Sequence, residues 1–476
     1  MVFYELKIGK MKKLKIRGNE LKKIGYSNDR AIALALNIVN KHCKRSDKTE
    51  VLELLEKINL LPENFLNEPV FGELAKMLSE KPVLKKQKKM VLNKTALEFK
   101  VYGTENIDKE TLQQMETAMK LPISVKGALM PDAHVGYGLP IGGVLATYNA
   151  VIPYGVGMDI GCRMCLSVFP FSPKKIDGER DRIKNILLNE TRFGLAEYKD
   201  LEDHEILERK EFSEIKFLKS LQKKFAEQLG TSGHGNHFVD VGFVEIAEFS
   251  SRINLQPGEY FAVLSHSGSR NFGSEVCKHY TQIATDKLEL TGEAARLAWL
   301  DLDSEEGQEY WAAMQLAGDY SHANHRIIHQ RLARAFGEKP IAIIENHHNF
   351  AWKEKLTDGE EIIIHRKGAT PAGIGDIGII PGTMASPAFI VTGKGNNDSM
   401  QSAAHGAGRL MSRAQAKNTF SESQMKKYLH EQGVELIGGG TDESPMAYKD
   451  IREVMKYQKD LVEVLGVFHP RIVRME

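Results

Sequence analysis

Residues 135–158 read VGYGLPIGGVLATYNAVIPYGVGM and carry no charged side chain. A helix of this length could span a lipid bilayer. Pro140, Pro153 and six glycines would break such a helix repeatedly. We therefore predict buried strands joined by tight turns, in a protein without a membrane-spanning segment.

The chain around this run, from residue 96 to 476, alternates short β-rich segments with helical ones. We expect strands within residues 138–150, 259–264 and 341–345. We expect long helices from about Ser274, as N-cap, to Leu290 and from about Tyr310 to Phe336. These patterns predict an α+β fold with a mixed β-sheet catalytic body and surrounding helices.

Residues 1–95 differ from the rest in their lysine clusters and helical patterns. The lysines gather at 10–15 and 85–89, and helical periodicity covers residues 31–39 and 51–61. We predict a small, mainly helical N-terminal unit of unknown role, with the second lysine cluster as a solvated linker.

The composition excludes several classes of protein. The 476 residues exceed what one hydrophobic core usually serves, and 64 basic side chains nearly balance 63 acidic ones. The overall charge therefore gives no indication of a polyanionic partner, which has to be inferred from local motifs. Four cysteines are too few for a disulfide framework, and the N-terminal sequence lacks a signal-peptide pattern. We expect a cytoplasmic, monomeric protein.

Five candidate metal ligands lie at glycine-rich or strand-end positions. They are Asp159, Cys162, His237, His266 and His348. Asp159 and Cys162 share the segment GMDIGCR, and their three-residue spacing lets a carboxylate and a thiolate face one centre. Each histidine has Asn or Ser neighbours, whose side chains can form hydrogen bonds that hold a metal ligand in place.

A second histidine pattern lies within the predicted helix 310–336. His322, His325 and His329 line one helix face and superficially resemble a zinc site. They lack the glycine and Asn/Ser neighbours of the other candidates. We interpret this stripe as a packed or solvated helix face.

The segment AHGAGR at 404–409 combines a histidine, glycines and a fixed cation. Its backbone amides can approach a phosphate closely, beside His405 and Arg409. A neutral imidazole there can attack an α-phosphate and form a phosphoramidate. We interpret His405 as a nucleophile, with a glycine-rich packing turn as the alternative.

These residues belong to an ordered set of motifs in which the chain resembles the RtcB family of RNA-splicing ligases over residues 96–470. The motifs are MPDAH (130–134), VGMDIGC (156–162), GNHF (235–238), HSGSR (266–270), HN (348–349), HRKGA (365–369) and HGAGR (405–409).

The resemblance implies a centre of two Mn²⁺ ions bridged by Cys162. Asp159 and His237 complete one ligand set, and His266 and His348 complete the other. Ligand chemistry alone also suits zinc, iron or cobalt.

The resemblance further implies that GTP guanylylates His405. RNA with a 3′-phosphate or 2′,3′-cyclic phosphate end is then joined to a 5′-hydroxyl end, in splicing or repair, with any activating partner unknown. The implied nucleotide contacts are Asn236, Phe238, Asp240, Asn349, Thr383, Ala407, Gly408, Arg409 and Tyr448. The implied RNA or phosphate contacts are Asp132, His134, Arg270 and Lys367.

Three departures from the family pattern lie where it recognises guanine. The segment 381–387 reads PGTMASP, Asp240 replaces the glutamate of GNHFxE, and the chain ends VRME instead of lysine-glycine. We expect Arg474 to replace the lysine and Tyr448 to stack on the base, with weaker selection of GTP over ATP.

Two other functions remain open. A metal-dependent phosphodiesterase or cyclic-phosphate hydrolase would keep the ligands but needs no nucleotidyl acceptor, against which His405 argues. A catalytically decayed nucleotide- or RNA-binding protein would not need five intact ligands.

Overall fold

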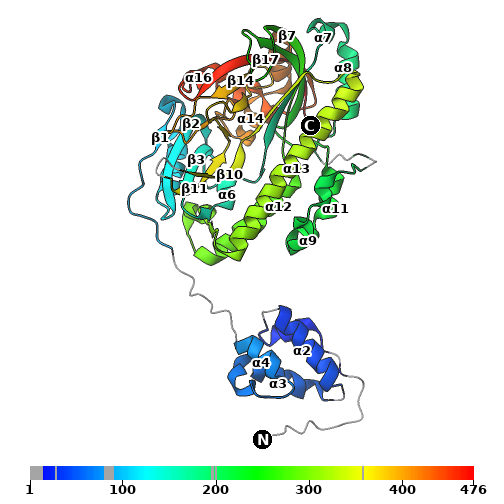
Figure 1. The fold of residues 1–476 in the computed structure, drawn as a ribbon, viewed down its shortest axis with the longest axis vertical. Helices are drawn as coiled ribbons and strands as arrows, with labels where there is room; N and C mark the ends of the chain where they lie inside the picture. Colours follow the sequence, from blue (N-terminus) through cyan, green and yellow to red (C-terminus); the bar gives the residue numbers. More distant parts are fainter. Residues whose placement is uncertain are drawn as a thin grey trace. The chain divides into compact units, whose positions relative to one another are not determined.

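The computed structural model describes residues 14, 16–26, 29–44, 46–79, 90–194, 198, 201–355 and 359–476. The chain divides into two compact units, Met1–Lys88 and Lys89–Glu476 (Figure 1). The boundary expected near residue 95 therefore lies a few residues later than this division, and Met90, Leu92 and Ala96 pack against the core of the second unit. The lysines at 10–15 and 85–89 lie outside the described residues.

The first unit is helical, and its core is formed by apolar residues such as Leu21, Ala35 and Leu55. Asp47 caps α3 by accepting hydrogen bonds from the amides of Thr49 and Glu50. Its elements are α1 Gly18–Lys23, α2 Asp29–His42, α3 Lys48–Leu60, η1 Pro62–Phe65 and α4 Gly72–Ser79.

The second unit contains two large sheets, each with both parallel and antiparallel pairs. The five-stranded sheet has the order β1 Lys100–Val101, β2 Ser124–His134, β3 Ile141–Thr147, β11 Glu361–Lys367 and β10 Asn349–Lys355. The eight-stranded sheet has the order β13 Ile377–Ile380, β14 Ala388–Gly393, β17 Val462–Arg474, β6 Phe238–Ile246, β7 Gly258–Ser267, β5 Arg163–Val168 and β9 Ala342–His347, with β16 Glu435–Ile437 beside β17. Two small pairs join β12 Ala369–Pro371 to β15 Ser402–Ala404 and β4 Ala150–Val151 to β8 Leu300–Asp301.

Helices surround these sheets, so the fold is α+β as predicted. They are α5 Lys109–Met119, α6 Pro153–Val156, α7 Lys174–Gly178, α8 Arg180–Glu190, α9 Glu211–Glu214, α10 Lys216–Lys219, α11 Gln222–Gln228, α12 Asn271–Leu288, α13 Glu305–Phe336, α14 Arg413–Thr419, α15 Glu422–Glu431 and α16 Ile451–Lys456. Short 3-10 helices are η2 Thr104–Asn106, η3 Glu205–Glu208, η4 Gly292–Leu297, η5 Thr441–Glu443 and η6 Pro445–Ala447.

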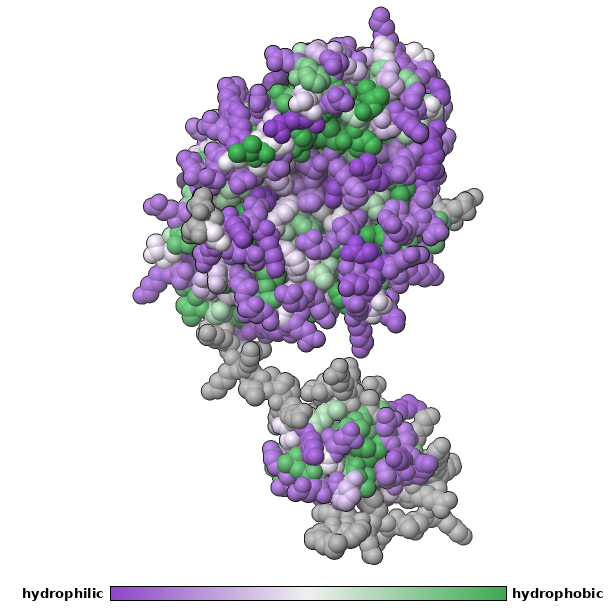
Figure 2. Space-filling model, viewed as in Figure 1, coloured by the Kyte–Doolittle hydropathy of each residue, from purple (hydrophilic) through white to green (hydrophobic). Residues whose placement is uncertain are grey.

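The uncharged run 135–158 forms strands β3 and β4 and the single turn α6, as expected from its prolines and glycines. Within the described residues, none of the helices combines the length and the apolar character needed to cross a membrane. Hydrophilic side chains cover most of the face shown in Figure 2.

The start of α12 differs from the sequence prediction. The helix begins at Asn271 rather than after Ser274, because Gln228 from α11 accepts a hydrogen bond from the Asn271 amide. α13 begins earlier than predicted, because Ser304 accepts from the Gly307 amide as N-cap. It ends at Phe336, as predicted.

α12 and α13 lie side by side (Figure 1) and pack through aromatic rings. The ring of Phe272 lies 4.3 Å from that of Phe225 and 5.5 Å from that of Tyr320, measured between centroids. Phe272 is fully buried. This contact anchors both long helices to the body.

We predict that Phe272→Ala lowers the free energy of unfolding of the second unit by about 3–5 kcal/mol, because the lost ring leaves a cavity. Phe249→Ala is the matched control, since Phe249 is 52% exposed. Urea unfolding followed by tryptophan fluorescence measures the difference, because all three tryptophans lie in the second unit. Equal stability of the two variants would contradict the packing role of Phe272.

Candidate metal centre and nucleotide cavity

The turn between α6 and β5 carries Asp159 and Cys162. Gly161 has φ +70°, and a Cβ there would lie 3.0 Å from the Cα of Gly318 on α13. Only glycine therefore allows this approach. Ser321 on α13 donates a hydrogen bond of 2.7 Å to the Gly161 carbonyl, which fixes the turn on the helix.

The five candidate ligands meet at the end of this turn. Cys162 Sγ lies 3.1 Å from His266 Nε2 and 3.5 Å from His237 Nε2. His237 Nε2 lies 2.9 Å from an oxygen of Asp159, and His266 Nε2 lies 3.3 Å from His348 Nε2. These five residues form two groups that could hold a metal ion, Asp159–Cys162–His237 and Cys162–His266–His348, and the two groups share Cys162.

The donor atoms fit metal ions in spacing and chemistry. Two ligands on one tetrahedral ion lie roughly 3.3–3.7 Å apart, which resembles the observed distances. Burial lowers the pKa of His266 to about 3 and that of His348 well below 6.5, so both imidazoles are neutral ligands at neutral pH. Within the described residues, one oxygen of Asp159 and Nδ1 of His348 are buried without a hydrogen-bond partner.

Neighbouring groups orient these ligands. The Asn236 carbonyl lies 2.9 Å from His266 Nδ1, so Nε2 of that ring faces Cys162. A Cβ at Gly268 would lie 2.2 Å from Asp159 Oδ1, so glycine leaves room for the carboxylate. Burial and Asp159 raise the pKa of Cys162 well above 9.0, so a bound cation is needed to hold the thiolate.

His405 follows β15 and is held by a buried carboxylate. An oxygen of Asp132 lies 2.6 Å from His405 Nδ1 and also accepts hydrogen bonds from the amides of His405 and Gly406. Asp132 is fully buried. The carboxylate therefore favours the tautomer with a proton on Nδ1, which leaves the lone pair on Nε2.

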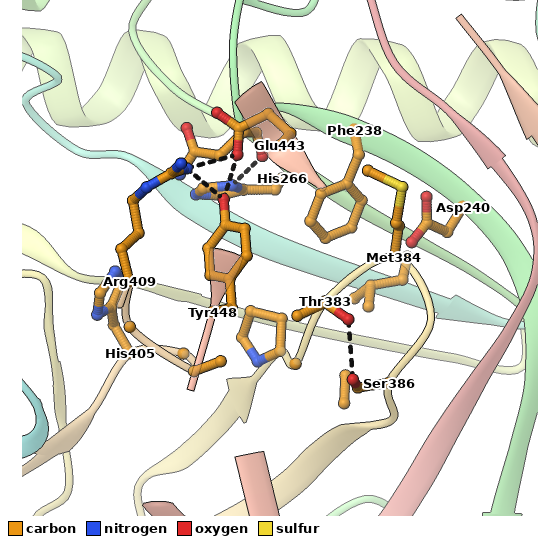
Figure 3. Close-up of a pocket in the computed structure, with 18 of the residues that line it drawn as sticks. Phe238, Asp240, His266, Thr383, Met384, Ser386, His405, Arg409, Glu443 and Tyr448 are labelled. Atoms are coloured by element: carbon orange, nitrogen blue, oxygen red, sulfur yellow. Dashed lines mark hydrogen bonds and ion pairs between the residues drawn. The ribbon is translucent and has the colours of Figure 1, made fainter. Parts of the chain in front are cut away.

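A cavity of about 440 Å³ connects His405 and the ligand cluster with a more apolar end. His266, His348 and His405 line one part of it. At the other end, Phe238 and Met384 lie beside Asp240 (Figure 3). The cavity has the polar and apolar ends that a nucleotide requires.

Arg409 is already bonded to protein acceptors. It donates to a Glu443 oxygen at 3.0 Å and to the Tyr448 hydroxyl at 2.9 Å (Figure 3). It also donates to the Asp442 carbonyl at 2.6 Å. Arg413 donates to the other Glu443 oxygen at 2.7 Å, and its side chain is 52% exposed. Arg413 is therefore the more accessible cation in this cavity.

Asp240 lies in the apolar end of the cavity. Burial raises its pKa well above 3.8, and its Oδ1 has no hydrogen-bond partner in the described part of the chain. Arg474, expected beside it, instead donates to the Ile437 carbonyl and lies over the Phe193 ring, 5.0 Å from its centroid. The structure does not place Arg474 beside Asp240. The side chains of Arg474 and its neighbour Val473 point to opposite faces of β17, and Val473 lines the cavity.

The predicted contacts fall into two groups. Those lining the cavity are Asn236, Phe238, Asp240, Thr383, Ala407, Gly408, Arg409, Tyr448 and His134. Asp132, Asn349, Arg270 and Lys367 are not among the described lining residues. Asn349 donates to the Asp159 carbonyl, Arg270 donates to Thr231 and Gly194, and Lys367 donates to the carbonyls of Tyr137 and Tyr154.

Sequence reasoning missed Arg413 and Glu443, which line the same cavity as His405. Glu443 comes three residues after the glycine run 438–440, which is a signal that could have indicated it. Arg409 lies outside a helix and Arg413 is the first residue of α14, so no helical spacing indicated that both cations bind the same carboxylate.

The chain matches the family described as tRNA-splicing ligase RtcB over residues 114–215 and 189–476. It is 32% identical to the RNA-splicing ligase RtcB1 of Escherichia coli over 394 residues, which cover 75% of this chain and 92% of that protein. It is 29% identical to the tRNA-splicing ligase RtcB of Methanococcus maripaludis, over 74% of this chain and 88% of that protein. It is also 29% identical to the RNA-splicing ligase RtcB of Mycobacterium tuberculosis, over 72% of this chain and 95% of that protein. The chain therefore belongs to the RtcB family of tRNA-splicing ligases.

Proposed function

We propose that this protein is an RNA ligase that joins a 3′-phosphate or 2′,3′-cyclic phosphate end to a 5′-hydroxyl end through a GMP–His405 intermediate. GTP is the proposed donor, and two Mn²⁺ ions are the proposed metals. The observation that carries the proposal is the position of His405. Asp132 orients its ring, and the ring lies 5.0 Å from that of His348, between centroids, at the edge of the ligand cluster.

The metals would be held by the two groups that share Cys162. Mn²⁺ would supply Lewis-acid stabilisation of negative charge on the attacking and leaving oxygens. The protein's own part is to hold neutral imidazoles and one carboxylate in place. Burial raises the pKa of the Asp159 carboxyl, but the interaction with His237 outweighs this effect. The pKa of Asp159 therefore lies below 3.8.

In the proposed first step, His405 Nε2 forms a bond to the α-phosphorus of GTP while the bond to the β-phosphate oxygen breaks and pyrophosphate leaves. The Asp132 carboxylate stabilises the positive charge that develops on the ring. Arg413 and Arg409, bridged by Glu443, place positive charge beside the phosphates.

In the second step, an oxygen of the RNA 3′-phosphate takes the GMP, and the bond from His405 Nε2 to phosphorus breaks. In the third step, the RNA 5′-hydroxyl attacks the 3′-phosphorus and GMP leaves. A cyclic phosphate is opened to the 3′-phosphate beforehand. All of the transfers are in-line displacements at phosphorus, so one site can serve them.

A cyclic-phosphate hydrolase is the competing function, and it requires no nucleotidyl carrier. Incubation with radiolabelled GTP and Mn²⁺ tests the difference. We expect an acid-labile protein adduct and joined RNA. Hydrolysis of the cyclic phosphate without adduct or joining would support the hydrolase.

We predict that His405→Ala abolishes the protein adduct and the joining of 3′-phosphate ends, because the nucleophile is lost. Bound metal should stay near the wild-type content, since His405 is not one of the grouped ligands. His430→Ala is the control, because His430 lies on the exposed part of α15. A large loss of metal from the His405 variant would reassign the residue as a ligand.

We predict that Cys162→Ser weakens both metal sites together. A shared thiolate neutralises charge on two cations, whereas a serine hydroxyl stays neutral at pH 7. Cys277→Ser is the matched control, since Cys277 is also buried but lies outside both groups. Metal analysis after dialysis measures the loss, and full occupancy with normal guanylylation would remove Cys162 from the centre.

We predict that GTP is the preferred donor, but with weaker discrimination against ATP than in a relative that retains the glutamate and terminal lysine. The Asp240 carboxylate can accept from N1 and N2 of guanine, but it is one methylene shorter than glutamate. Lengthened bonds would lose part of the roughly 1.5–3 kcal/mol that charged hydrogen bonds contribute.

Competition between GTP and ATP for adduct formation measures this selectivity, and Asp240→Glu should increase it. Arg474 does not supply the missing cation, because its guanidinium contacts the Ile437 carbonyl. Selectivity above roughly a thousandfold, or about 4 kcal/mol, would show that the pocket has compensated fully. A preference for ATP would overturn the choice of GTP.

A further inference from the structure

A layer of polar side chains lies between the eight-stranded sheet and α13. On β5, Met164 and Leu166 belong to an apolar core on one face, so Cys165 points to the other face. Cys165 is paired in register with Ser265 on β7 and with Glu345 on β9. Its thiol therefore lies in the middle of this polar layer.

Two histidines of α13 face the same position. His325 and His329 are four residues apart on one side of the helix, with ring centroids 6.5 Å apart. His322, the third member of the stripe in the sequence, instead approaches Glu345 at 2.6 Å and is 45% exposed. The three atoms that could bind one ion come from Cys165, His325 and His329, and they lie within 4.8 Å of one another.

The protonation states of this cluster suit metal ligands. Burial and the neighbouring His329 lower the pKa of His325 well below 6.5, although the Ser267 backbone opposes this in part. Burial lowers the pKa of His329 to about 4 and raises that of Cys165. Both imidazoles are therefore neutral at pH 7, and a cation would compete with one thiol proton.

Hydrogen bonds do not satisfy the whole cluster. The Ser265 hydroxyl lies 3.1 Å from His325 Nδ1 and 2.8 Å from His329 Nε2, and Ser167 lies 2.7 Å from His329 Nδ1. Nε2 of the fully buried His325 has no hydrogen bond of normal geometry within the described residues. His325, a member of the Cys165–His325–His329 group, therefore has one buried nitrogen whose hydrogen-bonding capacity is not met by the described residues.

We propose that Cys165, His325 and His329 bind a divalent cation of the zinc class, with the Ser265 hydroxyl or a water as fourth ligand. Thiolate and imidazole donors suit zinc, and two histidines four residues apart on a helix are a common zinc arrangement. The ion links α13 to β5. A cavity of about 640 Å³ is lined in part by Ser167 and by His329, one of the three proposed ligands.

This site is distinct from the centre at Cys162, because the two share no ligand. Ser265 and His266 are consecutive on β7, so their side chains leave the strand on opposite faces. Glu345 contributes negative charge beside Cys165, and its Oε1 lies near Arg163 and Arg326. The role of the zinc-class ion is to brace the helix and strand that support the first centre.

The test uses the full chain with the Cys162 thiolate removed. Metal-free C162S protein is titrated with Co²⁺, whose thiolate complexes absorb in the near ultraviolet, and separately with Zn²⁺. We expect C162S to retain a cobalt–thiolate band and to hold one more Zn²⁺ ion per chain than C162S/C165S, in which the band disappears. C162S/C277S is the matched control and should keep the band.

A second variant covers the case in which C162S/C165S fails to fold. C162S/H325N keeps the thiol and a polar side chain on α13 but removes one ligand, so the band should weaken or shift and Zn²⁺ should be lost on dialysis. Absence of the band in folded C162S, or its loss in C162S/C277S, would overturn the proposal. The C165S single variant should still form the GTP adduct, so failure of this site and failure of the proposed ligation are distinguishable.

Discussion

The contact between Gly161 and Gly318 is the constraint on which the centre depends. It allows the turn 157–162 to lie directly against α13, where Ser321 binds its carbonyl. A side chain at Gly161 would meet the Cα of Gly318 and push the turn away from the helix, whereas a side chain at Gly318 would meet the ring of Phe350. Cys162 could then no longer face His266 and His237 together, and the two ligand groups would lose their shared member.

Burial determines the chemistry around this turn. It keeps the imidazoles of His266 and His348 neutral and the thiol of Cys162 protonated in the absence of a cation. Metal binding is therefore coupled to release of the thiol proton. The same low-dielectric interior strengthens the interaction of Asp132 with His405, which fixes the orientation of the ring.

The two ends of the cavity differ in how closely they follow the family pattern. The candidate ligand cluster and His405 keep every expected residue, whereas the apolar end of the cavity has Asp240 among apolar side chains and has no contribution from Arg474. Family membership therefore supports the type of reaction more strongly than the identity of the nucleotide. The zinc-class site proposed beneath α13 would stabilise the scaffold without taking part in the transfer.

The sequence by itself determined the α+β class, the strands at 138–150 and the end of α13, because prolines, glycines and hydrophobic periodicity act locally. It also predicted the five candidate ligands and His405, which lie in compact motifs. Only the tertiary structure decided the start of α12, where Gln228 from another helix binds the Asn271 amide. Likewise, Cys165 and His325 are brought together by packing of α13 on β5, and Arg474 is turned away from Asp240 by the pleat of β17. Such pairings depend on which face of an element meets its neighbour, and spacing along one chain does not specify that.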